Sequence, residues 1–562
     1  MAMALLERCA NPVSPTGGPK DVSPPEAVRS EPPMHSVNFS GSEIRILFDE
    51  FIRLEDVTNQ LIVSPPLDET PVIKTRGKSV IVEFREELSD NTTYNIFFGD
   101  AIVDITEGNP ARNFRFAFST GPVIDSMSYN GRVLYAFDLE PPEGEVFAML
   151  YLLNNDTVPP DSMPLEVKPF YLTKPDEEGY FSFSNLKDEP MKLFALKDAN
   201  SNLIYDLPNE EIAFADTLII PQYPESIEDT TAITNDTVDQ ETTFGLTESP
   251  GLHTLYMFRE IDSTQQLLKA GPERPGLVLF VYKFPALEPR IMFMDYEPPP
   301  GSTMTNINRT KDTLFLWLRD FPYDSLICRV FDGEHELDTA AIRLTEKSER
   351  RKKDESAFPA LKISNNLNGD QFNPFLPLRL GFNYPVERFR DDRISILAGQ
   401  DTISAPFIFT DTIRRNGHFI YKWKENEEYT LIIPDSTFTG FPGNSHDSLK
   451  VTFNTMSSDD FGNFFLEVIP GDPDMNYIIQ LMTENGNEVM KRRIDNDSRL
   501  EFPYLMPGNY KVKAVADRNS NGRWDTGDYS EGLQPEKVLF FPKSITIRAA
   551  WDLEESWQLV LP

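Results

Sequence analysis

A stretch near the C-terminal end of the chain has the residue types and spacing of a calcium-binding loop. It runs from Asp517 to Asp525 and reads Asp-Arg-Asn-Ser-Asn-Gly-Arg-Trp-Asp. The oxygen-bearing side chains of positions 1, 3, 5, 9 and 12 are Asp517, Asn519, Asn521, Asp525 and Asp528. Gly522 stands at position 6, where such loops turn sharply. Three carboxylates, with a short aspartate in the closing position, predict weak affinity for structural Ca²⁺.

A weaker copy of this stretch lies 319 residues earlier in the chain. Its oxygen-bearing side chains are Asp198, Asn200, Asn202 and Asp206. Leu203 replaces the glycine and Asn209 replaces the closing acid. Asp and Asn also build tight loops without any metal, because their side chains accept hydrogen bonds from nearby backbone N–H groups. Both interpretations stay open from sequence: no cofactor is required, and a bound Ca²⁺ would stiffen the loop rather than catalyse.

The elements that position these loops are predicted to be β-strands. The chain of 562 residues has 46 prolines and 12% aromatic residues, with many short runs of alternating apolar and polar residues. Prolines and period-2 alternation disfavour long helices and favour sheets. The predicted fold is all-β, a tandem of β-sandwich domains of the immunoglobulin-like and transthyretin-like kinds with very little helix.

Repeated strand motifs predict a duplicated pair of domains. Tyr94 to Phe98 aligns with Tyr429 to Ile433, and Thr120 aligns with Thr455, both with an offset of 335 residues. The predicted order is a tether at 1–22, a sandwich at 23–122, a second at 123–222, an acidic linker or loop at 223–244, an unpaired sandwich at 245–354, and copies of the first two at 355–457 and 458–562.

Charge and motif content exclude several functional classes. The net charge of −36, from 89 acidic and 53 basic side chains, argues against nucleic acid as a partner. The five histidines are scattered, and the chain has no nucleophile elbow, phosphate-binding loop or dinucleotide fingerprint. The sequence therefore predicts a protein that is not an enzyme, with no catalytic residues.

The two cysteines have different surroundings. Cys328 lies in an apolar run and is expected to be a small buried side chain. Cys9 precedes a Ser/Pro/Gly-rich stretch, as in a bacterial lipoprotein whose acylated cysteine anchors a flexible tether. Only eight residues precede Cys9, too few for a signal peptide. Either the start codon is placed late and Cys9 is lipidated, or Cys9 is an ordinary thiol.

The chain resembles a family of Bacteroidota outer-membrane lipoproteins with S-layer-type immunoglobulin-like and transthyretin-like domains. The motifs that carry the resemblance are Cys9-Ala-Asn-Pro, Pro15 to Asp21 with Pro24-Pro25, Asp517 to Asp528, Gln534-Pro-Glu536 and Arg548 to Asp552. The resemblance implies a lipid anchor in the outer membrane and a non-enzymatic binding or scaffold role. Envelope proteins, such as a β-barrel or its accessory lipoproteins in an assembly or export complex, are the expected partners. A surface glycan-binding accessory role is the alternative.

Overall fold

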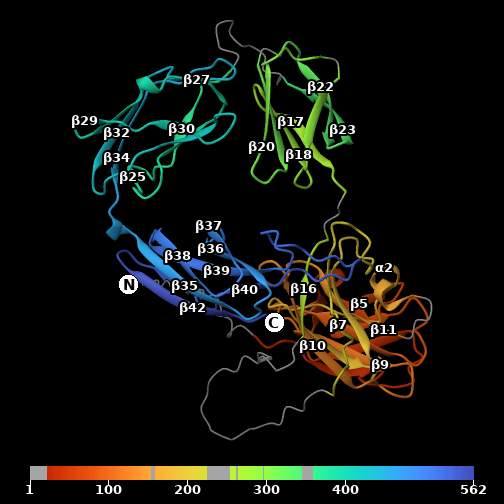
Figure 1. The fold of residues 1–562 in the computed structure, drawn as a ribbon. Helices are drawn as coiled ribbons and strands as arrows, with labels where there is room; N and C mark the ends of the chain where they lie inside the picture. The colour runs from red at the N-terminus through yellow and green to blue at the C-terminus, as the bar shows by residue number, and fades with distance from the viewer. Residues whose placement is uncertain are drawn as a thin grey trace, which may run out of the picture. The chain divides into compact units, whose positions relative to one another are not determined.

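The computed structural model describes residues 22–153, 158–223, 253–260, 264–294, 296–319, 321–344 and 358–561. The chain divides into two compact units, Met1–Ile261 with Trp524–Val538, and Asp262–Arg523 with Leu539–Pro562. Apart from short helical turns, the described residues form strands and their connections, which confirms the all-β prediction of tandem sandwiches. Each unit is described separately below (Figure 1).

The first unit begins with the first module, residues 22–122. Its larger sheet has the order β1 (Ala27–Glu31), β2 (Glu43–Phe48), β6 (Ser79–Glu83), β5 (Val72–Arg76). A second sheet joins β4 (Ile62–Ser64), β7 (Thr93–Gly99) and β9 (Phe114–Ser119), β3 (Ile52–Leu54) pairs with β8 (Ile102–Asp104), and one helical turn is α1 (Val57–Gln60). Alternate residues of β2 point inward, so Ile44, Ile46 and Phe48 are buried in the core.

The second module follows, and it extends further along the chain than the sequence indicated. One sheet has the order β13 (Tyr180–Leu186), β10 (Met127–Tyr135), β16 (His253–Met257). The other has the order β12 (Tyr171–Thr173), β11 (Val146–Leu152), β14 (Met191–Lys197), β15 (Glu211–Phe214), and the short turns η1 (Pro160–Ser162) and α2 (Met163–Glu166) join β11 to β12.

The strand β16 changes the expected boundary of this module. It pairs in parallel with β10, from Gly131 opposite His253 to Tyr135 opposite Met257 (Figure 1). Residues 253–257 therefore belong to the second module and not to a third sandwich beginning at 245. The acidic stretch predicted as a linker at 223–244 lies, after Tyr223, outside the described residues. So does the predicted tether, except Val22.

The second unit begins with the third module, residues 264–344. One sheet has the order β17 (Leu267–Arg274), β18 (Leu277–Tyr282), β21 (Thr313–Leu318), β20 (Thr303–Ile307), and the other has β19 (Pro289–Phe293), β22 (Ser325–Asp332), β23 (His335–Arg343). The third module shares a core with the fourth: Trp317 is fully buried beside Tyr384, whose hydroxyl donates to the Pro275 carbonyl at 2.9 Å.

The fourth module, residues 358–456, repeats the pairing of the first. One sheet has the order β24 (Ile363–Asn365), β26 (Arg379–Phe382), β31 (Asn416–Phe419), β30 (Phe407–Phe409). The other has the order β25 (Gln371–Phe372), β34 (Leu449–Thr455), β32 (Glu428–Ile433), β28 (Ser395–Ala398), β29 (Asp401–Ile403). The module also contains the strand pair β27 (Val386–Phe389) and β33 (Phe438–Gly440) and the turn η2 (Asp391–Arg393). The strands β32 and β34 begin 335 residues after β7 and β9.

Side-chain hydrogen bonds repeat between these two copies as well. The hydroxyl of Thr120 accepts from the Thr92 N–H at 3.0 Å and donates to the Ser89 carbonyl at 2.7 Å. In the fourth module, the hydroxyl of Thr455 accepts from the Glu427 N–H at 3.0 Å and donates to the Lys424 carbonyl at 2.6 Å. All three pairs of positions differ by 335, so the copies share local chemistry as well as strand order.

The fifth module, residues 457–561, repeats the second. One sheet has the order β38 (Ser498–Leu505), β35 (Gly462–Pro470), β42 (Asp552–Leu559). The other has the order β37 (Glu488–Ile494), β36 (Asn476–Thr483), β39 (Gly508–Asp517), β40 (Val538–Phe540), and β41 (Ile545–Ile547) also pairs with β39. The turn η3 (Ser458–Asp460) precedes these strands. The last strand β42 lies parallel to β35, as β16 does to β10. The second and fifth modules thus share a parallel strand pair at equivalent places in their sheets.

Cys328 is buried in the core of the third module, as the sequence predicted. Burial raises the pKa of its thiol to about 12, so the reactive thiolate is scarce near neutral pH. In a Cys9→Ala chain, we expect Cys328 to react with a thiol-specific disulfide reagent only after denaturant is added. Absorbance of the released thiolate measures the reaction. Rapid stoichiometric labelling of the folded protein would show that the strand β22 opens to solvent.

Candidate functional site

The first repeated loop connects β14 to β15 and is organised by one buried carboxylate. Asp198 is 7% exposed and accepts backbone hydrogen bonds from Ser201 and Leu203, both at 2.7 Å. Leu203 adopts a left-handed conformation with φ of 61°, which is unusual for a branched side chain. The loop therefore keeps the turn of a glycine-containing sequence although it has lost the glycine.

The amide side chains of this loop are turned toward its last acid. Asn200 Nδ2 donates to Asp206 Oδ1 at 3.1 Å, and Asn202 Nδ2 donates to Asp206 Oδ2 at 2.8 Å. The structure thus brings together all four residues that the sequence singled out. Their contacts are those of a hydrogen-bonded turn, in which the asparagines serve as donors to a carboxylate.

The second loop follows β39 and has the same organisation. Asp517 is 1% exposed, and it accepts from the Asn521 N–H and the Gly522 N–H, each at 2.9 Å. Gly522 has φ of 79°, matching the left-handed Leu203 in the other loop. The guanidinium of Arg493 lies 3.6 Å from Asp517 Oδ2 and donates to the Ser520 carbonyl at 2.8 Å. A protein cation therefore already faces this buried carboxylate.

The remaining predicted residues have local roles in turns. Asn519 Oδ1 accepts from the Asn521 N–H at 3.1 Å, and Asn521 Oδ1 accepts from the Arg523 N–H at 2.9 Å. Asp528 accepts from the Ser530 hydroxyl at 2.7 Å and from the Glu531 N–H at 3.0 Å, so it caps its own turn. Among the residues that the structure describes, no group of three or more His, Cys, Asp or Glu side chains is placed to hold a metal ion.

Two buried glutamates complete the loops and were missed from sequence. Glu210 is 1% exposed and accepts from the Asp206 N–H at 2.9 Å. Glu536 is 3% exposed and accepts from the Asp525 N–H at 3.0 Å. Each glutamate thus receives the amide of the ninth loop residue. Gln534-Pro-Glu536 carries part of the family resemblance, but among 89 acidic residues nothing in the sequence singles out Glu536 or Glu210.

The connection between Asp525 and Glu536 is seven residues longer than that between Asp206 and Glu210. The segment Trp524–Val538, which contains it, belongs to the first unit. There Tyr529 packs against Phe194, Tyr205 and Phe214, with ring centroids 5.9, 6.3 and 5.3 Å away.

Hydrogen bonds fix the same segment. Gln534 Nε2 donates to the Phe214 carbonyl at 2.9 Å and to Asp216 Oδ1 at 2.8 Å. The segment after the second loop is thus held on the first unit by hydrogen bonds and aromatic packing, while the loops themselves are turns with internal hydrogen bonds.

Cys9 lies outside the described residues, so its predicted lipidation remains a prediction. The helices in the part of the chain that the structure describes are all too short, or too polar, to span a bilayer.

Sequence comparison assigns the family of one module. Residues 21–120 match the bacterial Ig-like domain. The first module is thus of the kind the sequence indicated, while the Bacteroidota lipoprotein family remains a resemblance. No curated protein matches the chain.

Solved structures that the chain is similar to include a titin tandem, the surface layer protein SbsC and the Bacillus anthracis TIE protein. The titin tandem is 10% identical, with 52% of this chain and 100% of that chain covered and a TM-score of 0.12. SbsC domains one to six are 11% identical, with 93% of this chain and 67% of that chain covered and a TM-score of 0.13. The TIE protein is 10% identical, with 97% of this chain and 76% of that chain covered and a TM-score of 0.14. These scores are too low to bear on function or on the arrangement of the whole chain.

Proposed function

We propose that this protein is a non-enzymatic, lipid-anchored cell-envelope protein that binds other proteins as a scaffold subunit. The bacterial Ig-like domain of residues 21–120 supports the class. The observation that carries the proposal is a group of exposed apolar side chains on the third module, for which the described residues contain no copy.

The face on which they lie, called here the β19 face, is the outer side of the β19–β22–β23 sheet. Its exposed apolar side chains are Met292, Met294, Ile327 and Tyr323, with exposures of 45%, 51%, 39% and 55%. The Met294 N–H bonds the Ile327 carbonyl at 3.0 Å, so these two side chains lie on neighbouring strands. Methionine and aromatic residues are enriched in protein interfaces, and β19 is an edge strand that can accept another strand. Both features favour a protein partner.

A second candidate function, binding of surface glycans, is favoured by an aromatic cluster. Tyr296, Phe321 and Tyr323 lie edge to face, with centroids 5.2 to 5.9 Å apart. Exposed aromatic rings can stack on sugars. A glycan array probed with the wild-type protein and with Tyr323→Ala tests this role: saturable binding that the substitution removes would support it.

The proposed anchor is a lipid on Cys9 that holds the protein in the outer membrane, beside a β-barrel or its accessory lipoproteins. We expect Cys9→Ala to move the protein from the membrane fraction to the soluble fraction, because alanine cannot be acylated and the proposed lipid anchor is lost. Cell fractionation with mass spectrometry of the N-terminal peptide measures both properties, and Cys328→Ala is the control. Unchanged membrane recovery of Cys9→Ala, with no lipid on the wild-type peptide, would contradict the anchor.

A further inference from the structure

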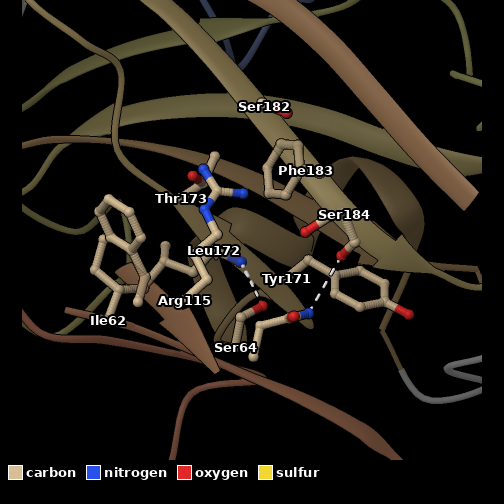
Figure 2. A pocket seen from close by; sticks show the side chains of 11 residues that line it. Ile62, Ser64, Arg115, Tyr171, Leu172, Thr173, Ser182, Phe183 and Ser184 are labelled. Carbon is tan, nitrogen blue, oxygen red and sulfur yellow. Dashed lines mark hydrogen bonds between the residues drawn. The ribbon is translucent and has the colours of Figure 1, made fainter. Parts of the chain in front are cut away.

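A small notch lies within the first unit, where the outer face of the β4–β7–β9 sheet meets β12 and β13. Its volume is about 30 Å³, enough for one or two water-sized groups. Two hydrogen bonds hold its walls together: the Leu172 N–H donates to Ser64 Oγ at 3.1 Å, and Asn95 Nδ2 donates to the Ser184 carbonyl at 3.2 Å (Figure 2). The walls thus come from both modules but are fixed relative to each other.

The notch is lined by one cationic side chain and several hydroxyls, which can donate or accept hydrogen bonds. Arg115 of β9 points into it, toward Thr173 and Phe183, with Ser184 beside them (Figure 2). Ser64, Thr173, Ser182 and Ser184 contribute four hydroxyls. No Asp or Glu lines the notch, although the chain has 89 acidic residues. The notch therefore has a local positive charge although the chain as a whole has a net charge of −36.

Arg115 is half-buried, and no carboxylate among the described residues forms an ion pair with it. Its guanidinium carbon lies 5.0 Å from the ring centre of Phe97, the residue opposite it on β7. Burial lowers the pKa of Arg115 below its ordinary value, because desolvation disfavours the charged form. Buried cations are ordinarily paired with an anion. Arg115 therefore has room for an anion from outside the described chain.

We propose that this notch binds a single carboxylate group through Arg115 and the surrounding hydroxyls. A planar guanidinium can pair with both oxygens of a carboxylate, and Ser182 and Thr173 line the same notch with hydroxyls that can donate hydrogen bonds. The volume of about 30 Å³ suits a group of the size of a carboxylate. The carboxylate belongs either to a free small acid or to an Asp or Glu side chain of a partner. This site is independent of the β19 face and goes beyond the proposed scaffold role.

The test uses the full chain and two probes in chloride-free buffer of constant ionic strength. The first probe is sodium formate, followed by broadening of its proton resonance. The second is a capped pentapeptide with one central Asp among glycines, and the same peptide with Asn is its control. We expect saturable formate binding by the wild type, weakened at least about tenfold in Arg115→Gln. Arg112→Gln, three residues away on the exposed surface, should bind as the wild type does.

The two probes separate the two sources of carboxylate. Tighter binding of the Asp peptide than of formate assigns the site to a partner's side chain, whereas binding of formate alone assigns it to a free acid. Arg115→Gln should keep or raise the melting temperature, since an unpaired charge is removed, and Ser182→Ala gives a second, milder loss of binding. The proposal is overturned if neither probe binds saturably, or if Arg115→Gln and Ser182→Ala bind formate as well as the wild type does.

Discussion

Replacing Asp517 with alanine is expected to accelerate hydrogen exchange at the Asn521 and Gly522 amides by roughly a hundredfold. The Asp517 carboxylate is buried and accepts both of these N–H groups. Its removal takes away the acceptor of the Gly522 N–H, the shorter of two bonds made by the Asn521 N–H, and the carboxylate that faces Arg493. We expect this to cost about 3 kcal/mol in the local free energy of opening. Exchange followed by mass spectrometry on peptides covering 517–523 measures the effect. Asp497→Ala, an exposed acid of the same module, is the matched control.

The same experiment decides between the two interpretations of the loop. Because Asp517 already holds the turn and Arg493 already faces it, we expect calcium or a chelator to change these exchange rates by less than about twofold. Slowing by calcium of about tenfold or more in the wild type, lost in Asp517→Ala, would instead establish a metal site. If the Asn521 and Gly522 amides exchange as slowly in the Asp517→Ala protein as in the Asp497→Ala protein, the Asp517 carboxylate does not hold the loop.

Tyr529→Ala is the second substitution with a large expected effect. Its ring packs against three aromatic side chains of the first unit, and truncating such a ring costs about 3 kcal/mol. We expect the segment Trp524–Val538 to become accessible to proteases, with cleavage mapped by mass spectrometry to positions between Gly527 and Leu533. Tyr529→Phe keeps the ring and loses only the hydroxyl bond to the Asp161 carbonyl, so its effect should be small.

Leu533→Ala is the matched control in this segment, because Leu533 is 51% exposed. It should remain as resistant to protease as the wild type. If Tyr529→Ala were equally resistant, the segment would be held by its hydrogen bonds, such as those of Gln534, and the aromatic packing would be incidental.

The repeated strands and loops were predictable from sequence because they depend on local rules. Alternating residues such as Ile44, Ile46 and Phe48 identify a half-buried strand, and the offset of Tyr94 and Tyr429 identifies a copy. The alignment of the two loops also placed Leu203 opposite Gly522, whereas the left-handed conformation of both residues is a finding of the structure.

Long-range pairing could not be predicted in the same way. The strand β16 joins β10 in parallel after a long intervening stretch, and no local pattern in His253–Met257 names its partner. The burial of Glu210 and Glu536 depends on the residues that pack around them in the folded chain. Nothing in the sequence distinguishes these two glutamates from the other acidic residues. Arg115 likewise could not be singled out from sequence, because the notch that it lines forms only where the first and second modules meet.

The most direct test of the proposed function is purification of the full-length protein from detergent-solubilised membranes, with quantitative mass spectrometry of what accompanies it. The account predicts recovery of envelope proteins, a β-barrel among them, in roughly stoichiometric amounts. A Met292→Glu, Ile327→Glu double variant should lower this recovery by at least about tenfold, since it places two charges on the β19 face. Ile408→Glu with Ile420→Glu, on exposed positions of the fourth module, should leave it unchanged. Glycan binding by a wild-type protein that recovers no stoichiometric protein partner would contradict the account.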